Sequence, residues 1–321
     1  MHESDAGPEA AGRGGAGVSR VAGATVLERG WLSSNNVLLH GDGGGAVLVD
    51  SGHGRHAAQT LALVHHALHG ETLAGVVNTH LHSDHCGGNA ALARAQGCRI
   101  TIPPGSWDAV AAWDEEALSY APTGQECERF GADARLAPGQ TLAVGRQRWL
   151  ALAAPGHDPH ALILYNELQG VVITADALWE RGFGVVFPEL DGMSAFDDVA
   201  AVLDLIESLD ARLAIPGHGA PFEDIAGALA AARSRLDGFR RDPMRHARHA
   251  LKVLVKFHLL ERERETLAQT MAWFATAGLY RRVWERLGRP AGALDAYAAQ
   301  LLAEMAAAGH LALVDGEVRN A

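Results

Sequence analysis

The sequence predicts a layered α/β domain followed by a helical C-terminal part. From about Val21 onward, short apolar runs rich in Val, Ile and Leu alternate with longer helical patterns, as in layered α/β proteins. After Phe222 the chain changes to long amphipathic segments. Four of the apolar runs also lead into His or Asp side chains, and the strand ends of a layered α/β fold meet at one edge. We therefore expect a flexible tail at 1–20, a main domain at 21–222 and a small helical domain at 223–321.

Apolar periodicity predicts the elements of the main domain. Residues 1–17 show no such periodicity, and they bury too little apolar surface to offset the entropy lost on ordering. Beyond them, short apolar runs predict strands, whereas apolar residues at three- and four-residue spacing predict helices. The expected strands are 37–40, 46–50, 75–78, 98–102, 148–153, 161–165, 171–174 and 211–215, and the expected helices are 55–69, 88–96, 105–118 and 195–209.

The C-terminal part is expected to consist of helices separated by Pro and Gly. The chain ends in two short apolar runs around Asp315-Gly316, a dipeptide that favours a type I′ hairpin turn. Helices followed by a hairpin are typical of a winged-helix unit, and the same pattern also serves as a dimerisation or lid element. The expected helices are 223–240, 243–262, 264–278, 279–287 and 291–308.

Composition and charge argue against several classes of protein. The 321 residues contain no run of eighteen consecutive apolar residues and no secretory signal at the start, so we expect no membrane span and a cytoplasmic location. Three cysteines without a CxxC pair favour neither a disulfide framework nor a thiolate zinc site. Residues 1–222 carry a net charge of −14, which repels phosphate backbones and argues against binding of nucleic acid.

The chemistry is expected where metal-ligand side chains follow the apolar runs. Directly after the run 75–78 comes an HxHxDH cluster, and three further runs each deliver one His or Asp. Because strand ends converge in such folds, these side chains define one pocket. Five imidazoles and two carboxylates favour Zn²⁺, Fe²⁺ or Mn²⁺ over Ca²⁺ and Mg²⁺, which prefer oxygen ligands. The candidate ligands are His80, His82, Asp84, His85, His157, Asp176 and His218.

With these motifs the chain resembles the metallo-β-lactamase-fold hydrolases over about residues 30–222. The resemblance implies an αββα sandwich of the metallo-β-lactamase type that binds two metal ions. It also implies that Asp50, in the turn Val49-Asp50-Ser51-Gly52, orients a ligand histidine through its other ring nitrogen. By position, it implies His80, His82 and His157 for the first ion, Asp84, His85 and His218 for the second, and Asp176 as the bridge between them.

The chain departs from the common pattern of that family in two places. Ala175 stands where a Gly usually precedes the bridging Asp, and residues 158–160 replace a small Thr/Ser-Gly segment and so alter the pocket wall. Within this wall, His160 is a candidate substrate contact, with a satisfied structural histidine as the alternative. Trp179 and Phe183 are expected as apolar pocket walls, with ordinary packing against the sheet as the alternative.

The expected function is that of a dinuclear metal-dependent hydrolase with two Zn²⁺ ions, Fe²⁺ or Mn²⁺ being the alternatives. A water shared by two ions loses its proton near neutral pH, and this bridging hydroxide would attack the carbonyl of an ester, thioester or lactone. Asp84 can also relay a proton to an alkoxide leaving group. The resemblance to the glyoxalase II-like and lactonase-like branches implies the same reaction class. The expected partner is a small-molecule acyl substrate. The terminal helices are also compatible with a homodimer.

Two other functions remain open on the sequence. One is a metal-dependent nuclease or phosphodiesterase with a winged-helix tail, which the charge of the main domain disfavours. The other is a non-catalytic metal-binding regulatory protein that uses the terminal helices for partners. A basic stripe is expected to face solvent or to lie against the acidic main domain. The alternatives are that it binds an anionic substrate, such as a coenzyme A or glutathione conjugate, or that it contacts RNA. The stripe consists of Arg241, Arg245, Arg248, Lys252 and Lys256.

Overall fold

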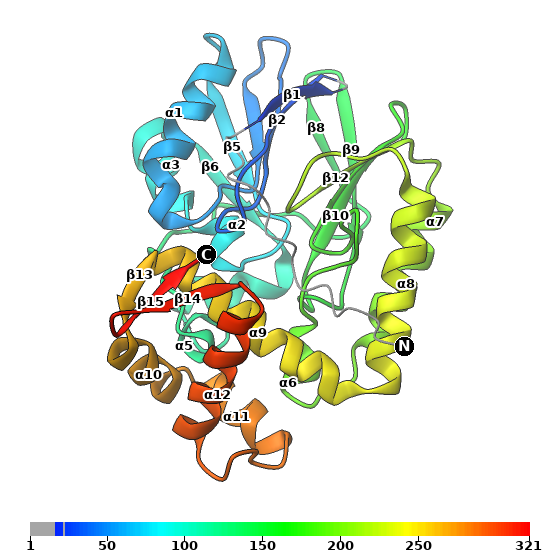
Figure 1. The fold of residues 1–321 in the computed structure, drawn as a ribbon. Helices are drawn as coiled ribbons and strands as arrows, with labels where there is room; N and C mark the ends of the chain where they lie inside the picture. Colours follow the sequence, from blue (N-terminus) through cyan, green and yellow to red (C-terminus); the bar gives the residue numbers. More distant parts are fainter. Residues whose placement is uncertain (1–16, 22) are drawn as a thin grey trace.

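A computed structural model describes residues 17–21 and 23–321, and its main domain is a sandwich of two β-sheets with helices on both outer faces (Figure 1). The first sheet has the strand order β1-β2-β3-β4-β5-β6-β7, and the second has the order β12-β11-β10-β9-β8. The expected αββα sandwich is therefore confirmed. Among the described residues, no helix has both the length and the apolar character needed to span a membrane.

The first sheet is antiparallel from β1 to β4 and parallel from β4 to β7. Helices α1 and α3 cover its outer face. Its strands are β1 (Val18–Val21), β2 (Ala24–Leu27), β3 (Asn36–Leu39), β4 (Ala46–Val49), β5 (Leu73–Val77), β6 (Arg99–Ile102) and β7 (Ala134–Arg135). The helices between them are α1 (Ala57–Leu68), α2 (Ser83–Cys86), α3 (Asn89–Gln96), α4 (Trp107–Ala112) and α5 (Tyr120–Thr123).

The second sheet is antiparallel from β8 to β11, and β12 then joins β11 in parallel. Helices α7 and α8 cover its outer face. Its strands are β8 (Thr141–Val144), β9 (Gln147–Ala153), β10 (Leu162–Asn166), β11 (Val171–Ala175) and β12 (Leu213–Pro216). The helices of this half are α6 (Phe187–Leu190), α7 (Phe196–Ser208) and α8 (Ile225–Arg241).

The central strands are largely apolar because both faces of each sheet are buried. In β3, Val37 and Leu39 point into the space between the sheets, where they join Trp149 of β9. Leu38 points the other way and packs with Val64 of α1. Side chains alternate along a strand, so a strand between two layers reads as a continuous apolar run.

The C-terminal part has a core of its own and packs against the edge of the sandwich at which the metal-ligand side chains lie. Its core includes Val185 from the loop beyond β11 and Leu190 of α6, and α11 contacts both α5 and α6. Four helices, α9 to α12, precede a hairpin, and β15 of the hairpin also pairs with β13. The elements are α9 (Pro243–Arg262), β13 (Arg264–Thr266), α10 (Leu267–Thr276), α11 (Gly278–Arg286), α12 (Leu294–Ala307), β14 (Leu311–Val314) and β15 (Glu317–Asn320).

The structure differs from the expected elements at several points. The helix expected over 105–118 ends at Ala112, because Trp113 has a φ of 56° and Asp114 accepts hydrogen bonds from the backbone N–H groups of Glu116 and Ala117. Residues 1–16 of the expected tail lie outside the described residues, whereas residues 18–20 belong to β1. Strands β1, β2, β7, β8 and β13, which are two to four residues long, were not expected.

Candidate metal centre

All seven candidate ligands lie at one edge of the sandwich, where the strands deliver them. His80 and His82 occupy the turn after β5, and Asp84 and His85 lie in the short helix α2 that follows. The remaining three side chains follow the ends of β9, β11 and β12, and they are His157, Asp176 and His218. The side chains form two groups, His80 with His82 and His157, and Asp84 with His85, Asp176 and His218; within each group the ligand atoms lie within 4.8 Å of one another.

The first group consists of three buried imidazoles. Nδ1 of His82 lies 2.8 Å from Nε2 of His157. Nδ1 of His157 donates to the carbonyl oxygen of Val185 at 2.6 Å, so its Nε2 is the nitrogen that faces the group. His80 contacts Oγ1 of Thr79 through Nδ1 at 3.1 Å, and its buried Nε2 has no hydrogen-bond partner in the described part of the chain. One nitrogen of each imidazole is therefore available to a shared ligand.

The second group places two carboxylates beside two imidazoles, and Asp176 connects it to the first. Oδ2 of Asp84 lies 3.1 Å from Nε2 of His218, and Oδ1 of Asp176 lies 3.3 Å from Nε2 of His85. The other oxygen of Asp176, Oδ2, lies 3.4 Å from Nε2 of His157 in the first group. One oxygen of Asp176 thus faces each group, which is the arrangement that a bridging carboxylate requires.

Asp50 lies behind this centre and contacts His85. Its Oδ2 atom is 2.8 Å from Nδ1 of His85, and its two oxygens accept hydrogen bonds from the backbone N–H and the hydroxyl of Thr79, each at 2.8 Å. A carboxylate can only accept here, so Nδ1 of His85 carries the proton and its Nε2 faces the second group. This is the contact by which an outer carboxylate fixes the tautomer of a ligand histidine.

Burial and the neighbouring charges set the ionisation of the centre. Burial lowers the pKa of His80 well below its ordinary value and that of His82 to about 4, so both imidazoles are neutral near pH 7. Burial opposes ionisation of Asp84, but His85 and His218 outweigh it and lower the pKa of Asp84 to about 2. Burial likewise disfavours a charge on His85, yet Asp176, Asp84 and Asp50 together raise its pKa well above the ordinary value.

The donor set fits transition-metal ions. The buried Nε2 atoms of His80 and His85 have no hydrogen-bond partner in the described residues, and an unpaired buried polar atom costs about 1–3 kcal/mol. Ionised carboxylates surround His85, so the second group attracts positive charge strongly. Neutral imidazoles and carboxylates are the ligands that Zn²⁺, Fe²⁺ and Mn²⁺ accept. A cation held by each group would give the unpaired Nε2 atoms a partner and would offset the negative charge around His85.

Backbone geometry restricts the choice of residue at two positions of the centre, Gly217 and Ala175. A Cβ atom on Gly217, just before His218, would overlap Oδ1 of Asp176, so only glycine fits there. Ala175 precedes Asp176 with a φ of 45°, a left-handed conformation that glycine adopts more easily than alanine. The glycine that the resemblance implies before Asp176 would therefore relieve backbone strain at this position.

The three predicted pocket residues occupy different environments. Trp179 belongs to the centre, because its Nε1 donates to Oδ1 of Asp176 at 3.3 Å. Phe183 is buried in the core beneath α7 and α8 with its ring against Phe239, which corresponds to the packing alternative. His160 is exposed, and its ring lies against Gly105.

Sequence reasoning missed two aromatic residues of the centre. The ring of Trp31, in the loop between β2 and β3, stacks on the ring of His218 with centroids 5.3 Å apart. The ring of Phe187 lies 4.7 Å from that of His82 and 5.5 Å from that of His157. Phe187 falls in the aromatic-rich loop after Asp176, which is a signal that could have found it. No motif marks Trp31.

The basic stripe on α9 is largely engaged within the C-terminal part. Nζ of Lys256 donates to the backbone oxygens of His310 and Ala321, each at 2.8 Å. Ion pairs also join Arg248 to Asp242 at 3.8 Å and Lys252 to Glu304 at 3.6 Å. The partners of Lys256, Arg248 and Lys252 all lie within residues 242–321.

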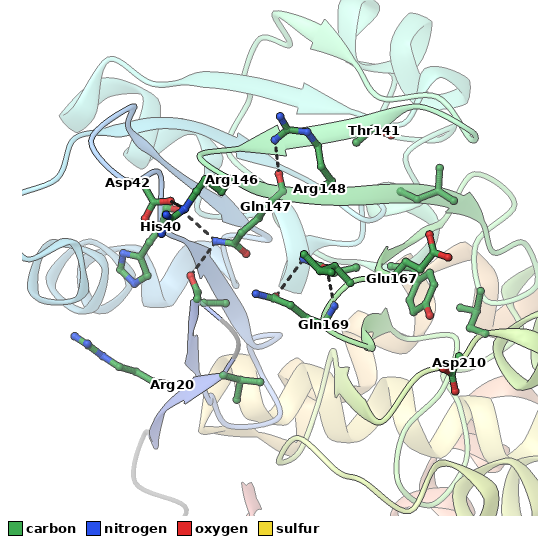
Figure 2. Close-up of a pocket in the computed structure, with 18 of the residues that line it drawn as sticks. Arg20, His40, Asp42, Thr141, Arg146, Gln147, Arg148, Glu167, Gln169 and Asp210 are labelled. Atoms are coloured by element: carbon green, nitrogen blue, oxygen red, sulfur yellow. Dashed lines mark hydrogen bonds and ion pairs between the residues drawn. The ribbon is translucent and has the colours of Figure 1, made fainter.

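A separate groove of about 1270 Å³ lies at the opposite end of the sandwich (Figure 2). Gln147, at the start of β9, lines it, whereas His157 follows the other end of the same strand. Two of its arginines have partners: Arg146 pairs with Asp42 at 3.2 Å, and Arg20 lies 2.6 Å from the His69 ring. The groove is therefore distinct from the candidate metal centre.

The two-sheet sandwich and its paired His/Asp groups define a class of metal-binding proteins with an αββα fold. A sequence model of the Metallo-beta-lactamase superfamily matches residues 29–218, which is more than half of the chain. The chain belongs to the metallo-β-lactamase superfamily.

Relatives and solved structures agree with this membership. A hydroxyacylglutathione hydrolase of Anaeromyxobacter dehalogenans is 32% identical over 209 residues, which cover 63% of this chain and 70% of the relative. An atrochrysone carboxyl ACP thioesterase of Aspergillus fumigatus is 24% identical over 274 residues, which cover 85% of this chain and 75% of the relative. A β-lactamase domain protein from Burkholderia ambifaria has the same fold, with a TM-score of 0.58 at 22% identity over 95% of this chain and 94% of its own.

Proposed function

We propose that this protein is a dinuclear metal-dependent hydrolase that cleaves an acyl thioester, with esters and lactones as chemically related substrates. The position of Asp176, with one oxygen toward each group of ligands, carries the proposal. Two sequence relatives named as a hydroxyacylglutathione hydrolase and an ACP thioesterase support the choice of a thioester.

Seven side chains would hold the two ions, for which Zn²⁺ is the first choice and Fe²⁺ or Mn²⁺ the alternatives. When bound, the ions supply Lewis acidity, which activates water for attack and polarises the carbonyl of the substrate. The ligands are His80, His82 and His157 for one ion, Asp84, His85 and His218 for the other, and Asp176 for both.

The protein's own groups contribute orientation and proton transfer. Asp50 holds the Nδ1 proton of His85, so that the Nε2 atom of His85 remains a ligand. Asp84 lies at the centre with its Oδ2 atom beside His218, and it can accept a proton at that oxygen and pass it to a leaving alkoxide. A thiolate is a stable leaving group near neutral pH and needs no such proton, which makes a thioester the less demanding substrate.

A substrate panel on metal-counted protein tests the proposal. The panel contains acyl thioesters, p-nitrophenyl esters, homoserine lactones and bis-p-nitrophenyl phosphate, with thioester cleavage followed by loss of its ultraviolet absorbance. We expect thioesters to be hydrolysed fastest. His82→Ala and Asp176→Ala should lose turnover together with bound metal, whereas the control His160→Ala should keep both. Hydrolysis of the phosphodiester alone would instead favour a nuclease, and no turnover by fully loaded protein would favour a regulatory role.

A further inference from the structure

Trp31 contacts the second ligand group although it belongs to a distant part of the chain. Its ring is nearly parallel to that of His218, with 11° between the planes and 5.3 Å between the centroids. The ring of Trp179 stands edge-on to both, at 5.5 Å from each. The three rings form a single aromatic cluster beside Asp84 and Asp176, which we call the tryptophan platform.

Hydrogen bonds hold the loop that carries Trp31 against the ligand loops. The N–H group of Ser34 donates to the carbonyl oxygen of Asp84 at 3.0 Å, and the N–H group of Asn35 donates to that of Gly217 at 2.6 Å. The side-chain amide of Asn35 adds hydrogen bonds to the carbonyl oxygens of Pro216 and Gly219, at 2.9 and 2.7 Å. Trp31 is therefore positioned by the same backbone that positions the ligands, before any substrate binds.

The exposure of Trp31 is unusual for so large an apolar ring. It is 38% exposed, whereas all seven candidate ligands are buried. One face lies on His218 and one edge meets Trp179, so the exposed part of the ring lies directly beside the second ligand group. Aromatic rings pack favourably against other flat apolar groups. Ligand sites usually combine a preformed apolar surface with a few polar groups.

We propose that the tryptophan platform binds an aromatic ring of the substrate, carried on the acyl or the thiol side of the scissile bond, and that Trp31 thereby determines specificity. The inference rests on the proposed thioester hydrolysis and names the substrate class for it. An aryl-bearing thioester would stack on Trp31 with its carbonyl near Asp176 and Asp84. A small acyl group such as acetyl would leave the platform uncovered and would bind more weakly.

Kinetics on matched thioesters test this inference. The substrates are the phenylacetyl and acetyl thioesters of N-acetylcysteamine, together with S-phenyl thioacetate, which moves the ring to the thiol side. Wild-type protein should prefer a ring-bearing substrate. Trp31→Ala should lower that preference by about tenfold or more, chiefly through KM, and Trp31→Phe should retain most of it. Trp107→Ala, a control at a tryptophan that packs against Arg135 rather than against a candidate ligand, should keep the preference unchanged.

Two further measurements separate specificity from a merely supporting role. Metal content is counted in each variant, because Trp31 also contacts the candidate ligand His218. Intrinsic fluorescence is titrated with phenylacetate, and we expect a saturable change in wild type and Trp107→Ala that Trp31→Ala loses. The inference is overturned if Trp31→Ala affects phenylacetyl and acetyl substrates equally, or if wild type shows no preference and no fluorescence response. A saturable response without turnover of any thioester would support the platform while contradicting the proposed hydrolysis.

Discussion

The Oδ2 atom of Asp50 lies 2.8 Å from Nδ1 of His85, and this contact decides which nitrogen of His85 faces the metal centre. Asp50 itself has a left-handed φ of 58° and is buried beneath the ligand turn. Its second hydrogen-bond partner, Thr79, immediately precedes His80. The turn of Asp50 and the ligand turn are thus joined by a carboxylate that lies in neither ligand group.

Replacement of Asp50 tests this orientation. Asp50→Asn keeps the size and one acceptor oxygen but presents an amide N–H toward Nδ1 of His85. The favoured tautomer of His85 then changes, and we expect metal affinity to fall by about 10–100-fold. Competition with a chromogenic chelator measures this affinity, with Asp42→Asn in the distant groove as the control. Equal affinities in Asp50→Asn and wild type would contradict the orienting role.

A second prediction concerns the close approach at Gly217. Gly217→Ala would place a Cβ atom against Oδ1 of Asp176 and force that carboxylate to move. Because small displacements of catalytic groups are costly, we expect turnover to fall about a hundredfold with the circular dichroism spectrum unchanged. Gly131→Ala is the control, since nothing lies within 4 Å of the added atom there. A fully active Gly217→Ala protein would show that the position of Asp176 is not critical.

Removal of metal should destabilise the protein. The carboxylates around His85 repel one another without a cation, and a ligand at a thousand times its dissociation constant stabilises the folded state by about 4 kcal/mol. Treatment with a chelator should therefore lower Tm, and Zn²⁺ should restore it where Mg²⁺ does not. Thermal scans before and after chelation measure the effect. A Tm that changes neither on chelation nor on addition of Zn²⁺ would argue against a bound cation at either group.

Acid should weaken the fold through His246. This side chain is buried between Phe196 and Phe239 and accepts a hydrogen bond from the N–H group of Val186. Burial lowers its pKa to about 3, so the unfolded chain binds a proton more readily than the folded one does. The stabilisation is complete above pH 6.5 and is lost as the pH falls toward 3, by an amount on the order of a few kcal/mol.

Urea unfolding at several pH values checks this dependence. His246→Gln keeps a hydrogen-bond acceptor but cannot be protonated, so its free energy of unfolding should fall less than that of wild type between pH 6.5 and 4. His65→Gln, on the exposed face of α1, should follow wild type. Parallel curves for His246→Gln and wild type would refute the assignment of this acid sensitivity to His246.

Local features of the sequence predicted the fold class and the strand ends at which the candidate ligands lie. Each candidate ligand follows a strand, and the sandwich architecture then brings the strand ends together. Helix 105–118 was predicted too long because a single Asp114 side chain caps a turn within it. Strand β7 has only two residues, and its pairing with β6 depends on the neighbouring strand rather than on its own sequence.

The aromatic residues around the centre were harder to predict. Phe183 and Phe187 occur in the same aromatic-rich segment after Asp176, and Phe183 lies in the core while Phe187 contacts His82 and His157. Nothing in the spacing distinguishes them, because the segment has no regular periodicity. Trp31 is 187 positions from His218, and their stacking depends on hydrogen bonds between the two loops. Such contacts are properties of the folded chain and leave no local pattern.

Anomalous diffraction from crystals of zinc-loaded protein tests the central claim most directly, since it locates each ion relative to its ligands. We predict two zinc sites per chain, one among His80, His82 and His157 and one among Asp84, His85 and His218. Asp176 should give one oxygen to each ion. A single site, or two sites with Asp176 bound to neither, would contradict a dinuclear centre bridged by that carboxylate.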